Sequence, residues 1–472
     1  MRFDEYRRHD AIGLAALIAN GDISPDEALD AALERAEAVN GKINAIILDL
    51  EDEARAAIAA GLPQGPLRGV PMPIKDISVH MRGHPTGAGS RLFASQPASE
   101  DSALIRLYRE AGMVLFAKTN TPEFGLSPIT APRANGATRN PWDIGRTSGG
   151  SSGGAAAAVA AGVTPAAHGS DGGGSIRIPA SCCGLFGLKP SRGRVSLAPS
   201  GEGWGGLSVQ HALTRSVRDS ALLLDIACTP QLGDPYWIDP PRESFLSQVG
   251  RDPGRLRIAF TDTALTFGAP EAPCAQAVRD TAALLASLGH HVEEARPQLD
   301  YHAMAAHGSV VVSTSVAAML NAEATRRGAP VREDEVEALT WLIYQSGLGV
   351  SGAEGALARQ QLYALGREMC RFFANYDMLV LPTLAQPPLL IGALDSDAKD
   401  LSGYAEELYA FMPNTQPFNA SGQPAASIPL AWHAGLPIGV QVVARPGDEA
   451  GLIRLAAQLE QAQPWFDRVA PL

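Results

Sequence analysis

Two runs of glycine and serine are embedded between apolar segments of this chain, rather than at a boundary between domains. GGSSGG occupies residues 149–154 and GGGS occupies residues 172–175. Such runs are ordinarily flexible connectors, but each of these two is followed at once by an ordered-looking apolar segment. Glycines in that position let successive backbone N–H groups turn toward one point. The pattern therefore predicts two tight loops in a packed core, and the second can form an anion-binding nest with a hydroxyl at its edge.

Strand and helix patterns alternate along the remainder of the chain. Helices are predicted at about 24–39, 101–111, 155–161, 273–288, 302–375 and 449–461, and buried strands at 113–117, 256–260, 378–382, 426–430 and 437–443. The first of these helices is expected to begin with Ser24 as N-cap, Pro25 in the first turn and Glu27 completing a capping box. The extended run 69–75 contains two prolines, which confine it to a sheet edge or an irregular strand. Residues 168–175 are predicted to form a loop. Strands separated by helices predict an α/β fold with a largely parallel or mixed sheet.

Composition narrows the class of protein. Of the 472 residues, 46% are apolar, which is enough for a sizeable core, and the 19% that are charged are too few for a disordered chain. The net charge of −12 argues against a nucleic-acid partner, because such a partner usually needs a basic face. Five cysteines without metal-like spacing do not indicate a disulfide framework. Charged N-terminal residues and the lack of a long, strongly apolar stretch predict no signal peptide, no membrane partner and a cytoplasmic location.

Several short motifs match nucleotide or metal sites only in part. Gly112–Thr119 lacks the second glycine of a phosphate-binding P-loop, and Gly201–Gly206 fits G-x-G-x-x-G but follows no strand. His80 and His84 are four residues apart, but an intervening glycine would break the helix that could align them on a metal. The sequence therefore indicates no metal and no organic cofactor.

A nucleophilic serine is the remaining candidate for chemistry. Gly149-x-Ser151-x-Gly153 formally fits the nucleophile elbow of the α/β-hydrolases, but the residues before it are rich in turn formers rather than strand-like. No histidine is singled out as the base. A buried lysine can replace it if the amine is neutral when it acts. Lys75 ends the apolar run PMPIK, so its amine can lie inside the protein, although a surface lysine at a strand end is the more common outcome.

Together, these residues resemble the amidase signature family. The likeness rests on Lys75 after GVPMPI, on GGSSGG with Ser151, on DGGGSIRIPA with Ser175 and on Gly187–Pro190, in the family's order and spacing. Supporting segments extend the match over nearly the whole chain. They are Lys118–Phe124 and Pro437–Gln441.

Within that family the chain is similar to bacterial amidases that include the 6-aminohexanoate cyclic dimer hydrolases. This likeness rests on Gly136–Trp142, Ala167–Gly169 and Phe418–Pro424. Gly172 is a departure, because the family often has threonine before the glycine pair of the nucleophile loop. The region 300–375 matches much less clearly.

The resemblance implies an α/β fold. It predicts a single α/β/α domain over residues 1–472, in which helices flank a central mixed sheet of mainly parallel type. The signature core would cover about 65–230, and the helices of about 300–375 would be an excursion from it.

The resemblance also implies the reaction and the role of each residue. A carboxylic amide would be hydrolysed through an acyl-enzyme on Ser175, with Ser151 carrying the proton between Ser175 and Lys75. In this family the bridging serine follows a cis peptide, here Gly150–Ser151. The oxyanion would be held by four backbone N–H groups, those of Gly172, Gly173, Gly174 and Ser175. Supporting positions would be occupied by Ser152, Asp171 and Arg177, and for the last two a purely structural salt bridge is an equally good interpretation.

Three functions are left open by the sequence. The first is a free-standing amidase for a small, largely apolar amide, with water as the acyl acceptor. The second is the glutamine-hydrolysing A subunit of an aminoacyl-tRNA amidotransferase, which the negative charge disfavours, and the third is a non-catalytic anion-binding protein. The pocket walls are expected from 300–375 and 411–424, with Phe411, Met412 and Phe418 as apolar surface. The expected partners are the small-molecule amide and water, and a homodimer is left open.

Overall fold

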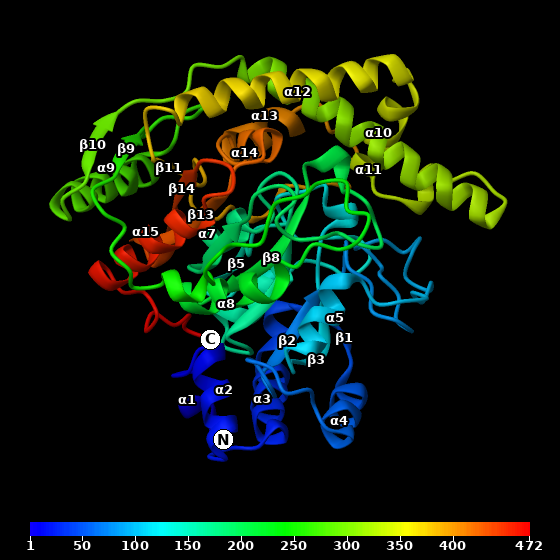
Figure 1. Ribbon diagram of the computed structural model, residues 1–472. Coiled ribbons are helices and arrows are strands. Elements are labelled where there is room, and N and C mark those ends of the chain that lie inside the picture. The colour runs from blue at the N-terminus through cyan, green and yellow to red at the C-terminus, as the bar shows by residue number, and fades with distance from the viewer.

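The computed structural model describes residues 1–472 and is built around one large sheet. The strands are β1 (Ile46–Asp49), β2 (Pro71–Lys75), β3 (Val114–Thr119), β4 (Arg139–Asn140), β5 (Asp143–Thr147), β6 (Ala166–Asp171), β7 (Phe186–Lys189), β8 (Val209–Thr214), β9 (Arg257–Phe260), β10 (His291–Glu294), β11 (Met378–Pro382), β12 (Ile391–Leu394), β13 (Ala425–His433) and β14 (Leu436–Ala444). Eight of them form the large sheet, in the order β10-β9-β11-β14-β13-β7-β8-β6. Helices surround this sheet, which confirms the predicted α/β class (Figure 1).

The helices account for most of the remaining ordered structure. They are α1 (Phe3–Tyr6), α2 (Ala11–Asn20), α3 (Pro25–Ile43), α4 (Glu51–Ala60), α5 (Ala103–Glu110), α6 (Gly153–Ala160), α7 (Arg177–Cys183), α8 (Val217–Ala227), α9 (Ala272–Ser287), α10 (Tyr301–Arg327), α11 (Ala338–Leu348), α12 (Gly352–Phe372), α13 (Tyr404–Phe411), α14 (Gln416–Ser421) and α15 (Glu449–Ala462). The start of α3 is as the sequence predicts. Ser24 and Glu27 form the capping box that begins α3, and Pro25 occupies its first turn.

The strand directions differ from the expectation of a mainly parallel sheet. Only the pairings of β10 with β9 and of β9 with β11 are parallel. The other five pairings in the large sheet are antiparallel. The unit β6-α7-β7 does give two parallel strands, but β8 comes later in the chain and inserts between them. Alternating strands and helices predict the direction of successive strands, but not which strand is inserted between them.

Apolar side chains bind the sheet to its helices in several clusters. The largest contains 66 buried residues and joins alternate residues of β13 and β14 to α8, α9 and α15. The alternate positions of β14 point the other way, where the N–H of Gly439 donates to Ser181 Oγ of α7 and Arg177 bonds to Gln441. The sheet is therefore covered on both faces, as its nearly continuous burial requires.

A second, three-stranded sheet lies beside the edge of the large one. Its order is β1-β3-β2, so β2 with its two prolines is an edge strand, and its register shifts between Met72 and Ile74. This confirms the prediction from the prolines, which cannot donate to a ladder. The last residue of β2 is Lys75, whose N–H donates to His168 Nδ1 on β6 at 3.3 Å. The two sheets therefore meet at Lys75.

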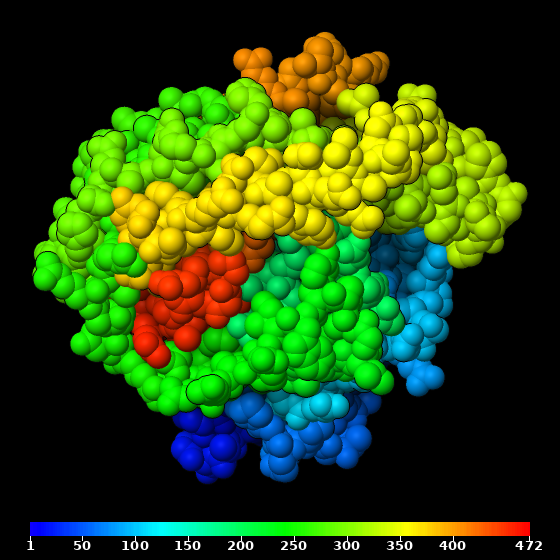
Figure 2. Space-filling model, turned by 45° about the horizontal axis from the view of Figure 1, so that its top comes forward, coloured from blue at the N-terminus to red at the C-terminus, as the bar shows by residue number.

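The helices α10, α11 and α12 form an arch over one end of the sheet, opposite the N-terminal helices (Figure 1). In the space-filling view, α12 runs as a continuous ridge across this arch (Figure 2). By its length and by a mean hydropathy of 1.5 over an 18-residue stretch, α10 alone could cross a membrane, but a helix in a protein core meets the same two criteria. Here α10 packs against α11, α12 and α14.

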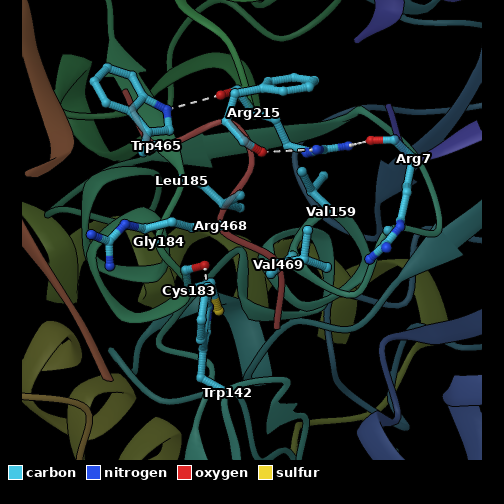
Figure 3. Close-up of a pocket in the computed structure, with 13 residues that line it drawn as sticks. Arg7, Trp142, Val159, Cys183, Gly184, Leu185, Arg215, Trp465, Arg468 and Val469 are labelled. Carbon is cyan, nitrogen blue, oxygen red and sulfur yellow. Dashed lines mark hydrogen bonds between the residues drawn. The ribbon is translucent and has the colours of Figure 1, made fainter. Parts of the chain in front are cut away.

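The two ends of the chain pack together below the sheet. Arg215 donates to the backbone oxygens of Arg7 and Phe466, and Trp465 Nε1 donates to the oxygen of Arg215 at 2.9 Å. A cavity of about 20 Å³ lies among these residues and Trp142 (Figure 3). Its volume suits about one water molecule, so this cavity is not a site for an organic substrate.

Candidate active site

Lys75 is buried at the C-terminal end of β2, and its amine contacts two hydroxyl groups. Nζ donates to Ser151 Oγ at 2.7 Å and to Ser170 Oγ at 3.0 Å, and the side chain is 0% exposed. No carboxylate lies within ion-pair distance of this amine, whereas the buried Lys118 pairs with Asp76 at 3.0 Å. The structure thus places Lys75 inside the protein and against Ser151.

The surroundings of Lys75 change its protonation. Burial lowers the pKa of Lys75 to about 7, even though the charge of Asp171 opposes the change. At that pKa a large fraction of the amine is neutral near neutral pH. The neighbouring His168 is neutral as well, because burial lowers its pKa to about 3. Since His168 Nδ1 accepts the N–H of Lys75, the ring proton lies on Nε2 and is donated to Gln210 Oε1 at 2.8 Å.

Ser151 lies in the first glycine-serine loop, between β5 and α6, and the Gly150–Ser151 peptide is cis. The glycines that follow are required by close packing. A Cβ on Gly153 would lie 2.3 Å from Thr130 Oγ1, and one on Gly154 would lie 2.4 Å from the N atom of Asn120. A strand does precede this loop, as an elbow requires, but it is β5, which forms a two-stranded hairpin with β4 and bridges to Leu390 and is not part of the large sheet. The side chain of Ser151 meets a lysine rather than a histidine.

Ser175 ends the second glycine loop and is 8% exposed. The predicted loop 168–175 is wrong in its first half, because residues up to Asp171 belong to the buried strand β6. The strand brings Ser170 to Lys75, and the turn beyond it leads to Ser175. Ser152 ties the two loops together, since its N–H donates to the oxygen of Ser175 at 3.2 Å and its hydroxyl donates to the oxygen of Ser170.

The carboxylate of Asp171 organises the turn at 172–175. It accepts the N–H of Gly174 at 2.8 Å and the N–H of Ile176 at 3.2 Å. This corrects the expected set of oxyanion donors, because the N–H of Gly174 is already bonded to Asp171. The N–H groups of Gly172, Gly173 and Ser175 have no partner within the protein. The predicted nest is therefore reduced from four donors to three.

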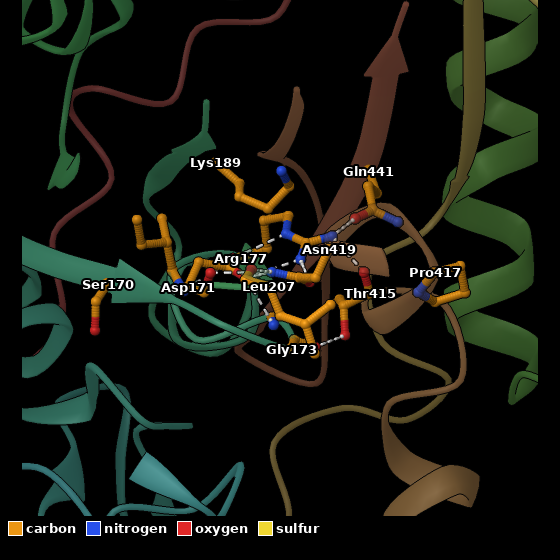
Figure 4. Close-up of polar contacts among 12 residues, drawn as sticks. Ser170, Asp171, Gly173, Arg177, Lys189, Leu207, Thr415, Pro417, Asn419 and Gln441 are labelled. Carbon is orange, nitrogen blue, oxygen red and sulfur yellow. Dashed lines mark hydrogen bonds and ion pairs between the residues drawn. The ribbon is translucent and has the colours of Figure 1, made fainter. Parts of the chain in front are cut away.

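Arg177 and Asp171 form a fully buried ion pair, with each side chain 0% exposed. Arg177 Nε and Nη2 each donate to Asp171 at 2.9 Å. Burial alone would raise the pKa of Asp171. The charge and hydrogen bonds of Arg177 nevertheless hold this pKa well below its usual range. The pair connects the turn to the C-terminal half of the chain (Figure 4), through Gln441, Asn419 and the backbone oxygen of Thr415.

Four residues of this network were not predicted from the sequence as site residues. Thr415 Oγ1 donates to the oxygen of Gly173 at 2.6 Å, and Asn419 Nδ2 donates to Asp171 Oδ1 at 2.9 Å. Gln441 and Ser170 complete the set. Asn419 and Gln441 lie in segments that contributed to the family resemblance, Phe418–Pro424 and Pro437–Gln441. That resemblance was the signal that could have identified these two residues. Ser170 lies in the predicted loop 168–175 and Thr415 in the expected wall segment 411–424, but no motif assigns either residue a role.

A cavity of about 390 Å³ opens beside Ser175. As expected, part of its wall comes from the 300–375 region, through residues of α10 and α11, and Met412 contributes as well. Phe411 and Phe418, which were expected in the wall, are instead buried in apolar clusters. The apolar side chains of this cavity are Leu126, Pro128, Ile178, Trp204, Val312, Leu342, Ile343, Leu408 and Met412, and its polar ones include Ser127, Ser309, Ser346, Tyr409 and Gln416.

The partial motifs have structural partners of their own. Lys118, from the segment resembling a P-loop, is 1% exposed and is held by Asp76. His80 Nδ1 bonds to Thr86 Oγ1 at 3.0 Å, whereas His84 Nε2 contacts Glu53 Oε1 at 2.5 Å. The two histidines therefore serve different parts of the surface rather than one common site.

Replacing Arg177 with methionine should destabilise the protein by about 3–5 kcal/mol, because Asp171 would be left buried without its counter-charge. Denaturant unfolding of both proteins measures the difference. The exposed pair Arg251–Glu243 is the matched control, since the loss of Arg251 should change stability by no more than about 1 kcal/mol. Equal effects of the two substitutions would contradict the assigned role of the buried pair.

Comparison with known proteins places this arrangement in context. A family model described as Amidase matches residues 27–453. A 6-aminohexanoate-cyclic-dimer hydrolase of Paenarthrobacter ureafaciens is 38% identical over 473 residues, which cover 97% of this chain and 96% of that protein. A solved structure of a 6-aminohexanoate cyclic dimer hydrolase superposes with a TM-score of 0.92 at 37% identity, over 98% of each chain. The crystal structure of a bacterial aryl acylamidase of the amidase signature enzymes superposes with a TM-score of 0.90 at 27% identity, over 98% of this chain and 99% of that one.

Proposed function

Because this chain belongs to the amidase family, we propose that it hydrolyses amides through an acyl-enzyme on Ser175, with Ser151 and Lys75 as the proton relay. The observation that carries this proposal is the 2.7 Å contact between Lys75 Nζ and Ser151 Oγ inside the protein. A buried amine with a pKa of about 7 can accept a proton near neutral pH, which an exposed lysine cannot do efficiently.

In the acylation step, Ser175 Oγ attacks the amide carbon. Its proton passes to Ser151, while the proton of Ser151 passes to neutral Lys75. As the carbon–nitrogen bond breaks, the relay runs backward, and the leaving nitrogen receives its proton from Ser151. The products of this half-reaction are the ester of Ser175 and a neutral amine, and the relay is back in its starting state.

The second step repeats the chemistry with water. Water gives a proton to the same relay and attacks the ester carbon, and Ser175 Oγ leaves with that proton. In both steps the developing negative charge on the carbonyl oxygen is stabilised by backbone N–H groups that are fixed beforehand. Gly172, Gly173 and Ser175 supply the unpaired N–H groups, while Asp171 and Arg177 keep the turn in place.

The large cavity supports a small, largely apolar acyl group as the substrate. Its walls are mainly hydrocarbon, and hydroxyl groups such as those of Ser127 and Ser346 are spread among them. Free glutamine would bring a charged ammonium and carboxylate into this cavity, and buried charges require partners. No side chain with a formal charge lines it. These features favour a hydrocarbon-bearing amide over glutamine, and hence an amidase over the amidotransferase subunit.

A panel of purified substrates tests this function. The isolated chain should release amine or ammonia from alkyl and aryl amides and should leave glutamine largely intact, and the cyclic dimer of 6-aminohexanoate belongs in the panel. Efficient glutamine hydrolysis with the apolar amides untouched would move the assignment to the amidotransferase class. If no amide were cleaved and no serine reacted with a fluorophosphonate, the anion-binding alternative would be favoured.

We also propose that the whole chain acts as one domain, in the cytoplasm and without nucleic-acid or membrane partners. The largest apolar cluster includes residues as far apart as Tyr6 and Trp465, which supports one domain. The net charge of −12 disfavours a nucleic-acid partner. All five cysteines are unpaired, which is usual for a reducing compartment.

The pH dependence of kcat/KM should follow the protonation of Lys75. Below a pKa of about 7 the amine is protonated and cannot accept a proton, so kcat/KM should fall about tenfold for each unit of pH. Above that pKa the rate should reach a plateau, because the neutral form then dominates. A pH–rate profile with a neutral amide measures this, and a rate that stayed flat from pH 5 to pH 9 would contradict the role of Lys75 as base.

A further inference from the structure

Two cavities, not one, meet at Ser175. The larger has a volume of about 390 Å³ and the smaller a volume of about 70 Å³. Both are lined by Gly125, Gly172, Ser175 and Trp204. An amide bound at Ser175 has two sides, an acyl group and an amine, so two cavities at one nucleophile raise the question of which side each cavity holds.

The two cavities differ in chemistry as well as in size. The smaller is lined by Ser151 and Ser170, the two hydroxyl groups bonded to Lys75, and also by Ser78 and Ser208. The larger lacks Ser151 and is lined mainly by hydrocarbon. The leaving nitrogen must lie within hydrogen-bond reach of the group that gives it a proton, directly or through one water. The cavity that contains Ser151 is therefore on the amine side of the bound amide.

Trp204 stands at the boundary of the two cavities on an unusual turn. Trp204, Gly205 and Gly206 have φ values of 49°, 58° and 86°, so a tryptophan occupies the left-handed region that favours glycine. A Cβ on Gly205 would lie 2.6 Å from Val311 Cγ1 of α10, and one on Gly206 would lie 2.4 Å from the hydroxyl of Tyr236. The turn is thus held tightly on both sides, and a residue kept in such a conformation is a candidate for function.

The ring of Trp204 also covers the turn that holds the oxyanion donors. A Cβ on Gly172 would lie 2.7 Å from Trp204 Cε3, so the indole is in direct contact with the backbone of Gly172. This contact explains why glycine stands at 172, where the family often has threonine. The freedom of the glycine is less important here than the space that its missing side chain leaves for the indole.

We propose that Trp204 separates an acyl site from an amine site, and that the amine site admits ammonia or a small alkylamine such as methylamine but excludes an amine as large as aniline. This assignment rests on the proposed function. The substrates would be primary amides, or N-methyl amides, of hydrocarbon acyl groups. An aniline-sized leaving group would have to displace the indole, because the space of about 70 Å³ on the Ser151 side is bounded by Trp204.

A series of amides with one acyl group tests the assignment in the intact protein. Hexanamide, N-methylhexanamide and hexananilide differ only in the amine. Wild type should cleave hexanamide at least tenfold more efficiently, in kcat/KM, than hexananilide. Aniline is the better leaving group, so chemical reactivity alone would give the opposite order. Cleavage of hexananilide as fast as hexanamide would overturn the assignment while leaving amide hydrolysis intact, whereas failure to cleave any amide would overturn both.

Replacing Trp204 with alanine should join the two cavities and shift the ratio toward hexananilide at least tenfold. Leu342→Ala is the matched control, because Leu342 lines only the larger cavity; it should alter the dependence on acyl length but leave the amine ratio unchanged. Fluorophosphonate labelling of Ser175 reports whether the Trp204→Ala site is intact. Should that variant not fold, Ser208→Leu, which fills the smaller cavity, should reduce cleavage of N-methylhexanamide at least tenfold relative to hexanamide. An unchanged ratio in a folded variant would overturn the role of its cavity.

Discussion

The Ser175→Ala enzyme should lose amide hydrolysis almost completely, with kcat reduced on the order of 10⁶-fold, the size of effect seen when a serine hydrolase loses its nucleophile. The oxygen that forms the ester is then missing, and no other hydroxyl occupies the end of the turn at 172–175. Release of ammonia from hexanamide at pH 8 measures the loss. The substitution removes one hydroxyl from a side chain that is 8% exposed, so unfolding by denaturant should be nearly unchanged.

Covalent labelling identifies the nucleophile independently of the substrate. A fluorophosphonate should label wild type at one residue, and mass spectrometry of the peptides should place the label on Ser175. The Ser175→Ala protein should remain unlabelled. A label on Ser151 would favour the elbow interpretation of Gly149–Gly153 and would overturn the assigned roles of the two serines.

The Lys75→Met enzyme should lose at least about 10³-fold in kcat/KM, because the relay then has no base. Methionine has a similar length and no ionisable group, so it can occupy the same buried space beside Ser151 and Ser170. Ser151→Ala should be severe as well, since the path of the proton is interrupted. Ordinary activity in Lys75→Met would disprove the mechanism.

The stability of Lys75→Met separates loss of the base from loss of the fold. An unfolded lysine has a pKa near 10.4, whereas burial lowers the pKa of Lys75 to about 7. Between these pH values the unfolded state binds more protons, so this lysine opposes folding. Its unfavourable contribution is complete below pH 7 and vanishes as the pH rises above about 10.4. The free energy of unfolding of Lys75→Met at pH 7 should therefore be no lower than that of wild type, and a large drop would show that the activity was lost through unfolding.

Several elements of the fold follow directly from local sequence. The capping box of Ser24 and Glu27 begins α3 as expected, because its hydrogen bonds form within one turn of chain. The edge position of β2 follows from two prolines that cannot donate to a ladder. The directions of the strands in the large sheet were wrongly predicted as mainly parallel. Long-range packing inserts β8 between β6 and β7, and the antiparallel hairpin of β13 and β14 is inserted between β11 and β7.

In the candidate site, too, some features could be predicted from the sequence and others could not. Lys75, Ser151 and Ser175 could be selected from their motifs, but no pattern in the chain places the amine of Lys75 against Ser170. The prediction of four oxyanion donors failed at Gly174 because Asp171, three residues earlier in the chain, already accepts its N–H. Phe411 and Phe418 could not be distinguished from wall residues by composition, since burial in a cluster and exposure to a cavity both require apolar side chains.

The sequence by itself determined which residues can take part in a reaction, the α/β class and the family, because motifs and periodicity depend only on the order of residues along the chain. Only the tertiary structure decided what those residues can do. It buried Lys75 where its amine has no carboxylate partner, and thereby lowered its pKa to about 7. It also set Trp204 between two cavities at Ser175, although Trp204 and Ser175 lie in different segments of the chain. Desolvation and cavity shape depend on everything packed around a group, and no local segment of sequence contains that information.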